Sequence, residues 1–239
     1  EPAQTAGRPM LDVLLRRLNA IEGLEWIRLL YAYPETLTEE TIEAMASCEK
    51  VCHYIDMPIQ HSENRILQRM GRRTSREDLV AVIKKLRQEI PDITIRTTLI
   101  TGFPGETKEQ HKELLEFIND MEFDRLGVFT YSPEEGTPAA AMEHQIDEEV
   151  KLDRQAELME LQQDISAELG ERRIGQELLV MIEGKVADED AYVGRSQADA
   201  PGVDGYVFVN TPETLVSGDF VRVKITGALE YDLIGEISQ

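Results

Sequence analysis

The chain has 239 residues, of which 41% are hydrophobic, and its 46 acidic and 25 basic residues give a net charge of −21. This length predicts one large domain or two smaller ones. With no apolar run near the ~18 residues of a membrane helix and no signal-peptide pattern at its start, the sequence predicts a cytoplasmic protein without a membrane partner.

The charge also bears on partners. A surface this negative repels phosphate backbones, so direct nucleic-acid binding is disfavoured and a basic protein partner is favoured. The simple alternative is an acidic surface that only keeps the protein soluble. Two cysteines provide no disulfide framework.

Strand-like and helix-like segments alternate over roughly the first 170 residues. The apolar spacing and the capping residues predict helices over 9–20, from Thr38, over 62–70, from Ser75, over 108–121 and over 147–169. The apolar runs between them predict strands over 26–33, 51–57, 94–101 and 125–131. The run over 94–101 is nearly unbroken, as in a strand covered on both faces. This alternation is typical of parallel βαβ units.

The character of the sequence changes after the long helix, which we expect Gly170 to end. Five short β-rich runs follow, separated by turns, and predict a small closed β-barrel. We therefore place a domain boundary near Arg172, with domains over 1–171 and 172–239. The second domain has six basic and twelve acidic residues, a net charge of −6, so its aromatic residues are expected in a core and a protein partner is more plausible than RNA.

Each of the four predicted strands ends abruptly in a polar or glycine-rich turn. The four segments are WIRLLYAYPE, VCHYIDMPIQH, TIRTTLITGFPGET and RLGVFTYSPEEGT. Because the carboxyl ends of parallel strands meet at one mouth of an α/β barrel, these turns predict a ligand site. GFPGET resembles a phosphate loop only superficially, since it lacks the GK[ST] that holds a nucleotide.

The combination of PIQHSENRILQRMGRR, TGFPGET and FTYSPEEGTPAA with a β-rich tail resembles the radical S-adenosylmethionine methylthiotransferases, whose tail is a TRAM domain. WIRLLYAYPE, PIQHS and YSPEEGT resemble the RimO branch, where the tRNA-modifying branch has PxQSGS-type and YSxRxGT motifs. The resemblance implies an α/β fold, with about four parallel βα units of a partial TIM-like radical-SAM barrel followed by a five-stranded TRAM barrel. It also implies an enzyme that methylthiolates an aspartate of ribosomal protein S-twelve of the small subunit.

The same resemblance implies S-adenosylmethionine and two iron–sulfur clusters as cofactors. In the family, the cluster ligands lie in an N-terminal cysteine domain and in a CxxxCxxC motif, and this sequence contains neither. Cys48 and Cys52 have CxxxC spacing, but Ile55 stands where the third ligand would fall, so we expect two ordinary cysteines and no metal site. We therefore expect this chain to be inactive alone and to expose the edge of its first strand, through which copies could dimerise.

For cofactor binding, the resemblance implies that Gln60 and Arg72, the latter on the helix after the second strand, reach the amino-acid end of S-adenosylmethionine. An amide and a guanidinium suit that group. It also implies that Ile100 packs near the adenine, and Gly102 belongs to the adjoining turn. The alternatives are that Arg72 and Arg73 form a solvated basic pair and that GFPGET is only a structural turn.

For substrate binding, the candidates are His61, Tyr131, Ser132, Glu134 and Glu135. The two glutamates would suit a basic protein loop and repel tRNA phosphate, although an exposed acidic turn is an equal alternative, and His61 could be a pocket residue or a loop histidine. No catalytic residue is assigned. The competing hypotheses are a tRNA methylthiotransferase of the same family, a non-catalytic module that binds a basic protein, and an unrelated barrel hydrolase, which the absence of a Ser-His-Asp set disfavours.

Overall fold

The computed structural model describes residues 9–238, which form two compact units. The first unit ends at Met159 and the second begins at Glu160, a division that falls inside helix α6 (Glu148–Glu171). The predicted domain boundary near Arg172 follows the end of this helix and stays a prediction.

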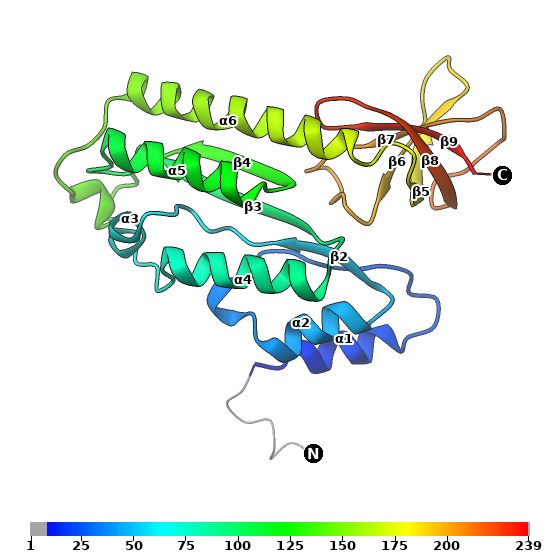
Figure 1. Cartoon of the computed structure of the whole chain (residues 1–239), viewed down its shortest axis with the longest axis horizontal. Coiled ribbons are helices and arrows are strands. Elements are labelled where there is room, and N and C mark those ends of the chain that lie inside the picture. The colour runs from blue at the N-terminus through cyan, green and yellow to red at the C-terminus, as the bar shows by residue number, and fades with distance from the viewer. Residues whose placement is uncertain (1–8, 239) are drawn as a thin grey trace. The chain divides into compact units, whose positions relative to one another are not determined.

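The first unit alternates helices and strands as the sequence predicted (Figure 1). Its strands are β1 (Ile27–Leu29), β2 (Val51–Asp56), β3 (Thr94–Thr101) and β4 (Arg125–Thr130). Its helices are α1 (Leu11–Asn19), α2 (Glu39–Ser47), α3 (Asn64–Arg69), α4 (Arg76–Glu89) and α5 (Lys108–Met121), with short 3-10 turns η1 (Pro34–Thr36) and η2 (Ala139–Ala141). Thr38 caps α2, and Ser75 with Asp78 forms the predicted capping box of α4.

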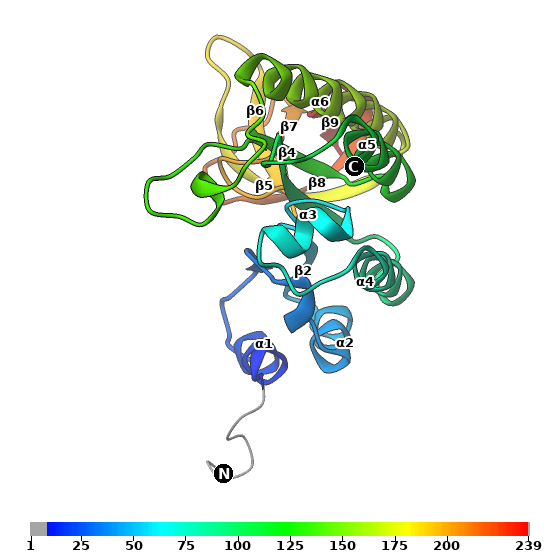
Figure 2. The same cartoon turned by 90° about the vertical axis from the view of Figure 1, so that its left-hand side faces the viewer.

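The four strands form one parallel sheet in the order β1-β2-β3-β4, which confirms the predicted partial barrel. Helices α2, α4 and α5 follow one another along one side of this sheet (Figure 2). Within the described part of the chain, β1 pairs only with β2, so it forms an edge of the sheet. Dimerisation through that edge stays a prediction.

Strand β3 is not covered equally on its two faces, which corrects the prediction for 94–101. Ile95, Thr97 and Leu99 are buried, whereas Arg96, Thr98 and Ile100 are only half-buried. Buried and half-buried positions alternate from Ile95 to Ile100, so one face of the strand is more exposed than the other. The β-branched composition hid this period of two, because threonine serves on either face.

Strand β1 is shorter than the predicted segment 26–33. After Leu29 the chain turns away from the sheet, and Tyr31 adopts a left-handed conformation with φ of 59°. The Tyr31 amide donates to Asp56 Oδ2 and the Ala32 amide donates to the Asp56 carbonyl. After Leu29, contacts of Tyr31 and Ala32 with Asp56 at the end of β2 thus replace regular strand pairing.

Gly170 lies inside α6, one residue before its end, so the prediction that it ends the helix is wrong. A Cβ at this position would meet Ala228 Cβ at 3.2 Å. The glycine therefore permits a close approach of the helix to strand β8, within the second unit.

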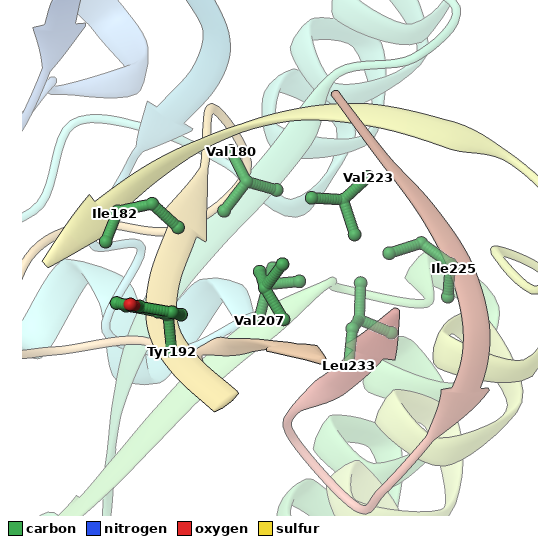
Figure 3. Packing of buried hydrophobic residues seen from close by; sticks show 8 residues of the cluster. Val180, Ile182, Tyr192, Val207, Val223, Ile225 and Leu233 are labelled. Carbon is green, nitrogen blue, oxygen red and sulfur yellow. The ribbon is translucent and has the colours of Figure 1, made fainter. Parts of the chain in front are cut away.

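The second unit contains five strands that close into a barrel in the order β5-β6-β7-β9-β8, as predicted. They are β5 (Glu177–Lys185), β6 (Ala191–Ser196), β7 (Val207–Asn210), β8 (Phe220–Ala228) and β9 (Leu233–Ile237). All neighbours are antiparallel except β7 and β9. Alternate residues such as Val180, Val207 and Ile225 point inward and fill the interior (Figure 3).

Candidate functional site

A pocket of about 380 Å³ lies at the carboxyl ends of the parallel strands. We call it the strand-end pocket; its lining residues are Tyr31, Ala32, Tyr33, Pro58, Gln60, Arg72, Arg96, Thr98 and Phe129. All four strands or the turns that follow them contribute to it. This is the mouth position at which α/β barrels carry their sites.

Gln60 is held in the strand-end pocket by its backbone. Its amide donates to the Thr98 carbonyl at 2.9 Å, and its carbonyl accepts from the Ile100 amide at 2.8 Å. Between these bonds, Gln60 has a φ of 71°, a conformation that costs energy for any residue except glycine. The segment after β2 is therefore tied to β3, and the amide side chain is directed by a constrained backbone.

Arg72 lines the strand-end pocket together with Gln60, but it does not lie on a helix, which corrects the prediction. Helix α3 ends at Arg69, and the amide of Arg72 then donates to the Leu67 carbonyl at 2.9 Å. Its guanidinium lies 5.2 Å from the centroid of the Tyr33 ring and 3.5 Å from the Pro58 carbonyl. The ring and the turn orient a cation whose remaining donors can face a ligand.

Arg96 is a lining residue that the sequence reasoning missed. It stands directly beside Asp56 in the β2–β3 pair, and its Nη1 contacts Asp56 Oδ1 at 3.0 Å. The informative sign in the sequence is an arginine within the otherwise uncharged run TIRTTLIT, since a charge in a buried strand requires a partner or a function.

Behind the GFPGET turn lies a second polar group, which we call the Glu106 cluster: Glu106, His61, His111 and Arg154. Glu106 accepts hydrogen bonds from the amides of Gly102 at 2.8 Å and Phe103 at 3.3 Å and from Arg154 Nη1 at 2.8 Å. His61 Nε2 lies 3.6 Å and His111 Nδ1 lies 4.0 Å from this carboxylate. One side chain therefore ties the turn after β3 to the first part of α6.

The environment of Glu106 keeps it ionised. Burial by itself raises the pKa of Glu106, but interaction with His61, the charge of Arg154 and the Gly102 amide outweigh it, so the pKa lies below its usual value of 4.5. The side chains of Glu106 and Arg154 are 0% and 9% exposed, respectively, so this ion pair is shielded from solvent.

Three other predicted residues, His61, Gly102 and Ile100, lie outside the strand-end pocket. His61 is fully buried, and its Nδ1 accepts from the Glu63 amide, so it is neither a surface-loop histidine nor a lining residue. Gly102 has a φ of 71° and faces the Lys151 side chain. Ile100 lies on the same face of β3 as Arg96 and Thr98, and it packs against Ile66, Phe103 and Tyr131.

The remaining substrate-side candidates divide between interior and surface. Tyr131 is 8% exposed, its ring packs edge-on against Phe103, and its carbonyl accepts from Lys151 Nζ. Ser132, Glu134 and Glu135 are exposed. The structure thus presents the acidic turn to solvent and keeps the tyrosine before it inside.

Cys48 and Cys52 are free and buried. Among residues 9–238, there is no group of three or more histidine, cysteine, aspartate or glutamate side chains that could hold a metal ion. None of the helices that the structure describes is both long and apolar enough to cross a membrane.

Two family models match the chain. Residues 4–118 match the radical SAM superfamily, and residues 174–237 match the TRAM domain. The first segment contains β1, β2 and β3 of the parallel sheet and stops before β4, and the second contains the five strands of the closed barrel. Part of a solved radical S-adenosylmethionine methyltransferase, TsrM from Kitasatospora setae, has a TM-score of 0.45 at 20% identity, over 55% of this chain and 26% of that one.

Curated relatives named ribosomal protein uS12 methylthiotransferase RimO match nearly the whole chain. The protein of Lachnoclostridium phytofermentans is 57% identical over 96% of this chain, and that of Pelotomaculum thermopropionicum is 52% identical, also over 96%. In both comparisons this chain spans only 52% of the relative's length. By these similarities and its two domain types, the chain resembles the RimO branch of the radical S-adenosylmethionine methylthiotransferases over nearly its whole length.

Proposed function

We propose that this chain forms part of a cytoplasmic enzyme that transfers a methylthio group to an aspartate side chain of ribosomal protein uS12. The observation that carries the proposal is the strand-end pocket, where Gln60 and Arg72 meet at the mouth of the parallel sheet. The relatives are named as methylthiotransferases of ribosomal protein uS12, and this name supports uS12 as the substrate. The aspartate as target is what the family resemblance implies.

The lining residues fit the amino-acid end of S-adenosylmethionine. The guanidinium of Arg72 can pair with a carboxylate, and the amide of Gln60 offers both a donor and an acceptor. Tyr33 and Phe129 add apolar surface beside these groups. When bound with a reduced iron–sulfur cluster, the cofactor supplies a radical able to remove hydrogen from an unactivated C–H bond.

The chain's own contribution is to position groups. The Glu106 cluster holds the turn that contains Gly102, and we propose that this turn and Ile100 border the adenine end of the cofactor. We propose Ser132, Glu134 and Glu135 as direct contacts for a basic segment of uS12, because they are exposed. For His61 and Tyr131 we propose a supporting role, because both are buried.

The two iron–sulfur clusters are proposed to be bound outside this chain, which spans 52% of the relatives compared above. On this proposal the isolated chain does not catalyse methylthiolation. The longer protein that contains it is the form in which activity is to be measured.

The test uses the full-length protein with its clusters loaded, incubated with S-adenosylmethionine and either uS12 or tRNA. Mass spectrometry should find a methylthio group on an aspartate of uS12 and none on tRNA. Modification of tRNA alone would favour the other branch of the family. Binding of uS12 without modification by a fully loaded protein would favour a non-catalytic binding module.

A further inference from the structure

The strand-end pocket contains two guanidinium groups, those of Arg72 and Arg96, and its lining includes no acidic side chain. This composition is unusual for a chain with a net charge of −21. A concave site with this lining attracts anions, and it has the donors to hold two of them. The proposed contact of Arg72 and Gln60 with the cofactor carboxylate leaves the second guanidinium, that of Arg96, without an assigned role.

The guanidinium of Arg96 is held in place by the neighbouring strand. Asp56 is 2% exposed, and its two carboxylate oxygens contact different partners: Oδ1 lies 3.0 Å from Arg96 Nη1, and Oδ2 accepts from the Tyr31 amide at 3.1 Å. The aspartate therefore orients both the Arg96 guanidinium and the Tyr31 turn. A guanidinium has five N–H donors, so this ion pair is compatible with contact to a second carboxylate.

The strand on the other side of Arg96 leaves room beside it. Gly127 of β4 has no side chain, and a Cβ built there would lie 4.0 Å from Arg96 Nη2 and 3.9 Å from the Phe129 ring. The side chain of Arg96 is 20% exposed, so it is accessible from the pocket. An anion that enters beside Arg72 and Gln60 can therefore meet a fixed, partly desolvated cation.

We propose that Arg96 binds the carboxylate of the target aspartate and thereby selects an acidic side chain as the substrate. This inference rests on the proposed function. The carboxylate of an aspartate is attached to its β-carbon, so a grip on the carboxylate places the β-carbon hydrogens in the pocket that holds the cofactor residues. On this proposal, each of the two arginines binds a different carboxylate: Arg72 binds that of the cofactor, and Arg96 binds that of the substrate aspartate.

The experiment compares two uS12 peptides that differ only by aspartate or asparagine at the target position, which are nearly equal in shape. Their affinities for the full-length, cluster-loaded protein are measured by fluorescence anisotropy in the presence of S-adenosylmethionine. The unaltered protein should prefer the aspartate peptide by about 10- to 100-fold, the range that a hydrogen bond between charged groups supports. Arg96→Gln should bring this ratio close to one and leave the affinity for S-adenosylmethionine unchanged.

Arg125→Gln is the matched control, because Arg125 precedes Gly127 on β4 and is no lining residue of the pocket. It should preserve the preference for aspartate. Arg96→Lys, which keeps the charge but loses the planar fork, should retain part of the preference and serves if the glutamine variant folds poorly.

An Arg96→Gln protein that still prefers the aspartate peptide would overturn the inference. So would a loss of S-adenosylmethionine affinity with an unchanged peptide preference, which would assign Arg96 to the cofactor. If the unaltered protein modifies no uS12 peptide at all, the proposed function itself is wrong. This outcome can be told apart from a failure of the Arg96 inference, because it is seen without any substitution.

Discussion

At the scale of single residues, Glu106 links the turn after β3 to α6 through its carboxylate. Its carboxylate accepts the amides of Gly102 and Phe103 and pairs with Arg154, so it neutralises one buried charge and satisfies two backbone donors. In the sequence, Glu106 stands out only as part of the GFPGET turn. The contact with Arg154 spans 48 positions, a separation that no local pattern reveals.

We predict that Glu106→Gln lowers the free energy of unfolding of the first unit by about 3 to 5 kcal/mol, because it leaves the shielded charge of Arg154 without its partner. Urea denaturation followed by the fluorescence of Trp26, the single tryptophan, measures this unit. Glu109→Gln is the control, since Glu109 is an exposed residue of the same segment and its replacement should change stability little. Equal stabilities of the two variants would contradict this role of Glu106.

The same residue predicts a dependence of stability on pH. Because the pKa of Glu106 is lower in the folded chain than its ordinary 4.5, the unfolded chain binds this proton at a higher pH than the folded chain does. The stabilisation is therefore present above about pH 4.5 and is lost as the pH falls through the lower, folded value. The stability difference between the native chain and Glu106→Gln should shrink in that window; a difference that stays constant would show that Glu106 does not titrate as stated.

At the scale of elements, alanine substitutions of the two glycines in the GFPGET turn report how tightly the surrounding side chains pack against this turn. Gly102 and Gly105 both have positive φ, 71° and 78°, so an alanine at either position costs about 1 to 2 kcal/mol in backbone strain. Their surroundings differ. A Cβ at Gly102 would lie 2.4 Å from the buried stem of Lys151, whereas at Gly105 it would meet the end of the exposed Arg69 side chain, which can move aside.

We therefore expect Gly102→Ala to destabilise the first unit by at least about 1 kcal/mol more than Gly105→Ala, because overpacking adds to the strain. Urea denaturation of both variants measures the difference. If Gly105→Ala lowered the free energy of unfolding more than Gly102→Ala, the packing of Lys151 against this turn would not explain the cost of the Gly102 substitution.

The closed barrel offers a second comparison between glycines. A Cβ at Gly235 of β9 would lie 2.5 Å from Val223 Cγ1 and 2.6 Å from the Lys224 carbonyl, but one at Gly184 of β5 would meet nothing within 4 Å. Gly235→Ala should cost about 1 to 3 kcal/mol, and Gly184→Ala should stay within about 0.5 kcal/mol. Hydrogen exchange of amides from the barrel strands, read by mass spectrometry, reports the loss; similar exchange in both variants would refute the prediction.

At the scale of the whole molecule, the net charge of −21 is the property most relevant to recognition. The acidic turn at Glu134 and Glu135 is exposed, so it can add to the attraction of a basic protein. Such attraction between exposed charges falls with added salt, because the Debye length shortens to about 10 Å at 0.1 M.

We predict that Glu134→Lys with Glu135→Lys weakens the binding of uS12 to the full-length protein by about 5- to 50-fold at low salt and less at high salt. Titration calorimetry at two ionic strengths measures this. Replacing Glu22 and Glu25, two exposed residues before β1, by lysine changes the net charge equally and is the control for charge alone. Equal losses in both variants would mean that net charge, and not the turn, governs binding.

The sequence by itself determined the order of elements, the parallel sheet and the closed barrel, because these depend on local periodicity and capping residues. The resemblance to the family implied that Gln60 and Arg72 contact the cofactor; both line the strand-end pocket, and the cofactor contact stays a prediction. Only the tertiary structure decided that His61 and Tyr131 are interior, that Glu106 pairs with Arg154, and that Arg96 lines the strand-end pocket beside Asp56. Burial and long-range pairing depend on which strand and helix faces meet, and a period-two pattern built from threonine and isoleucine does not specify the face.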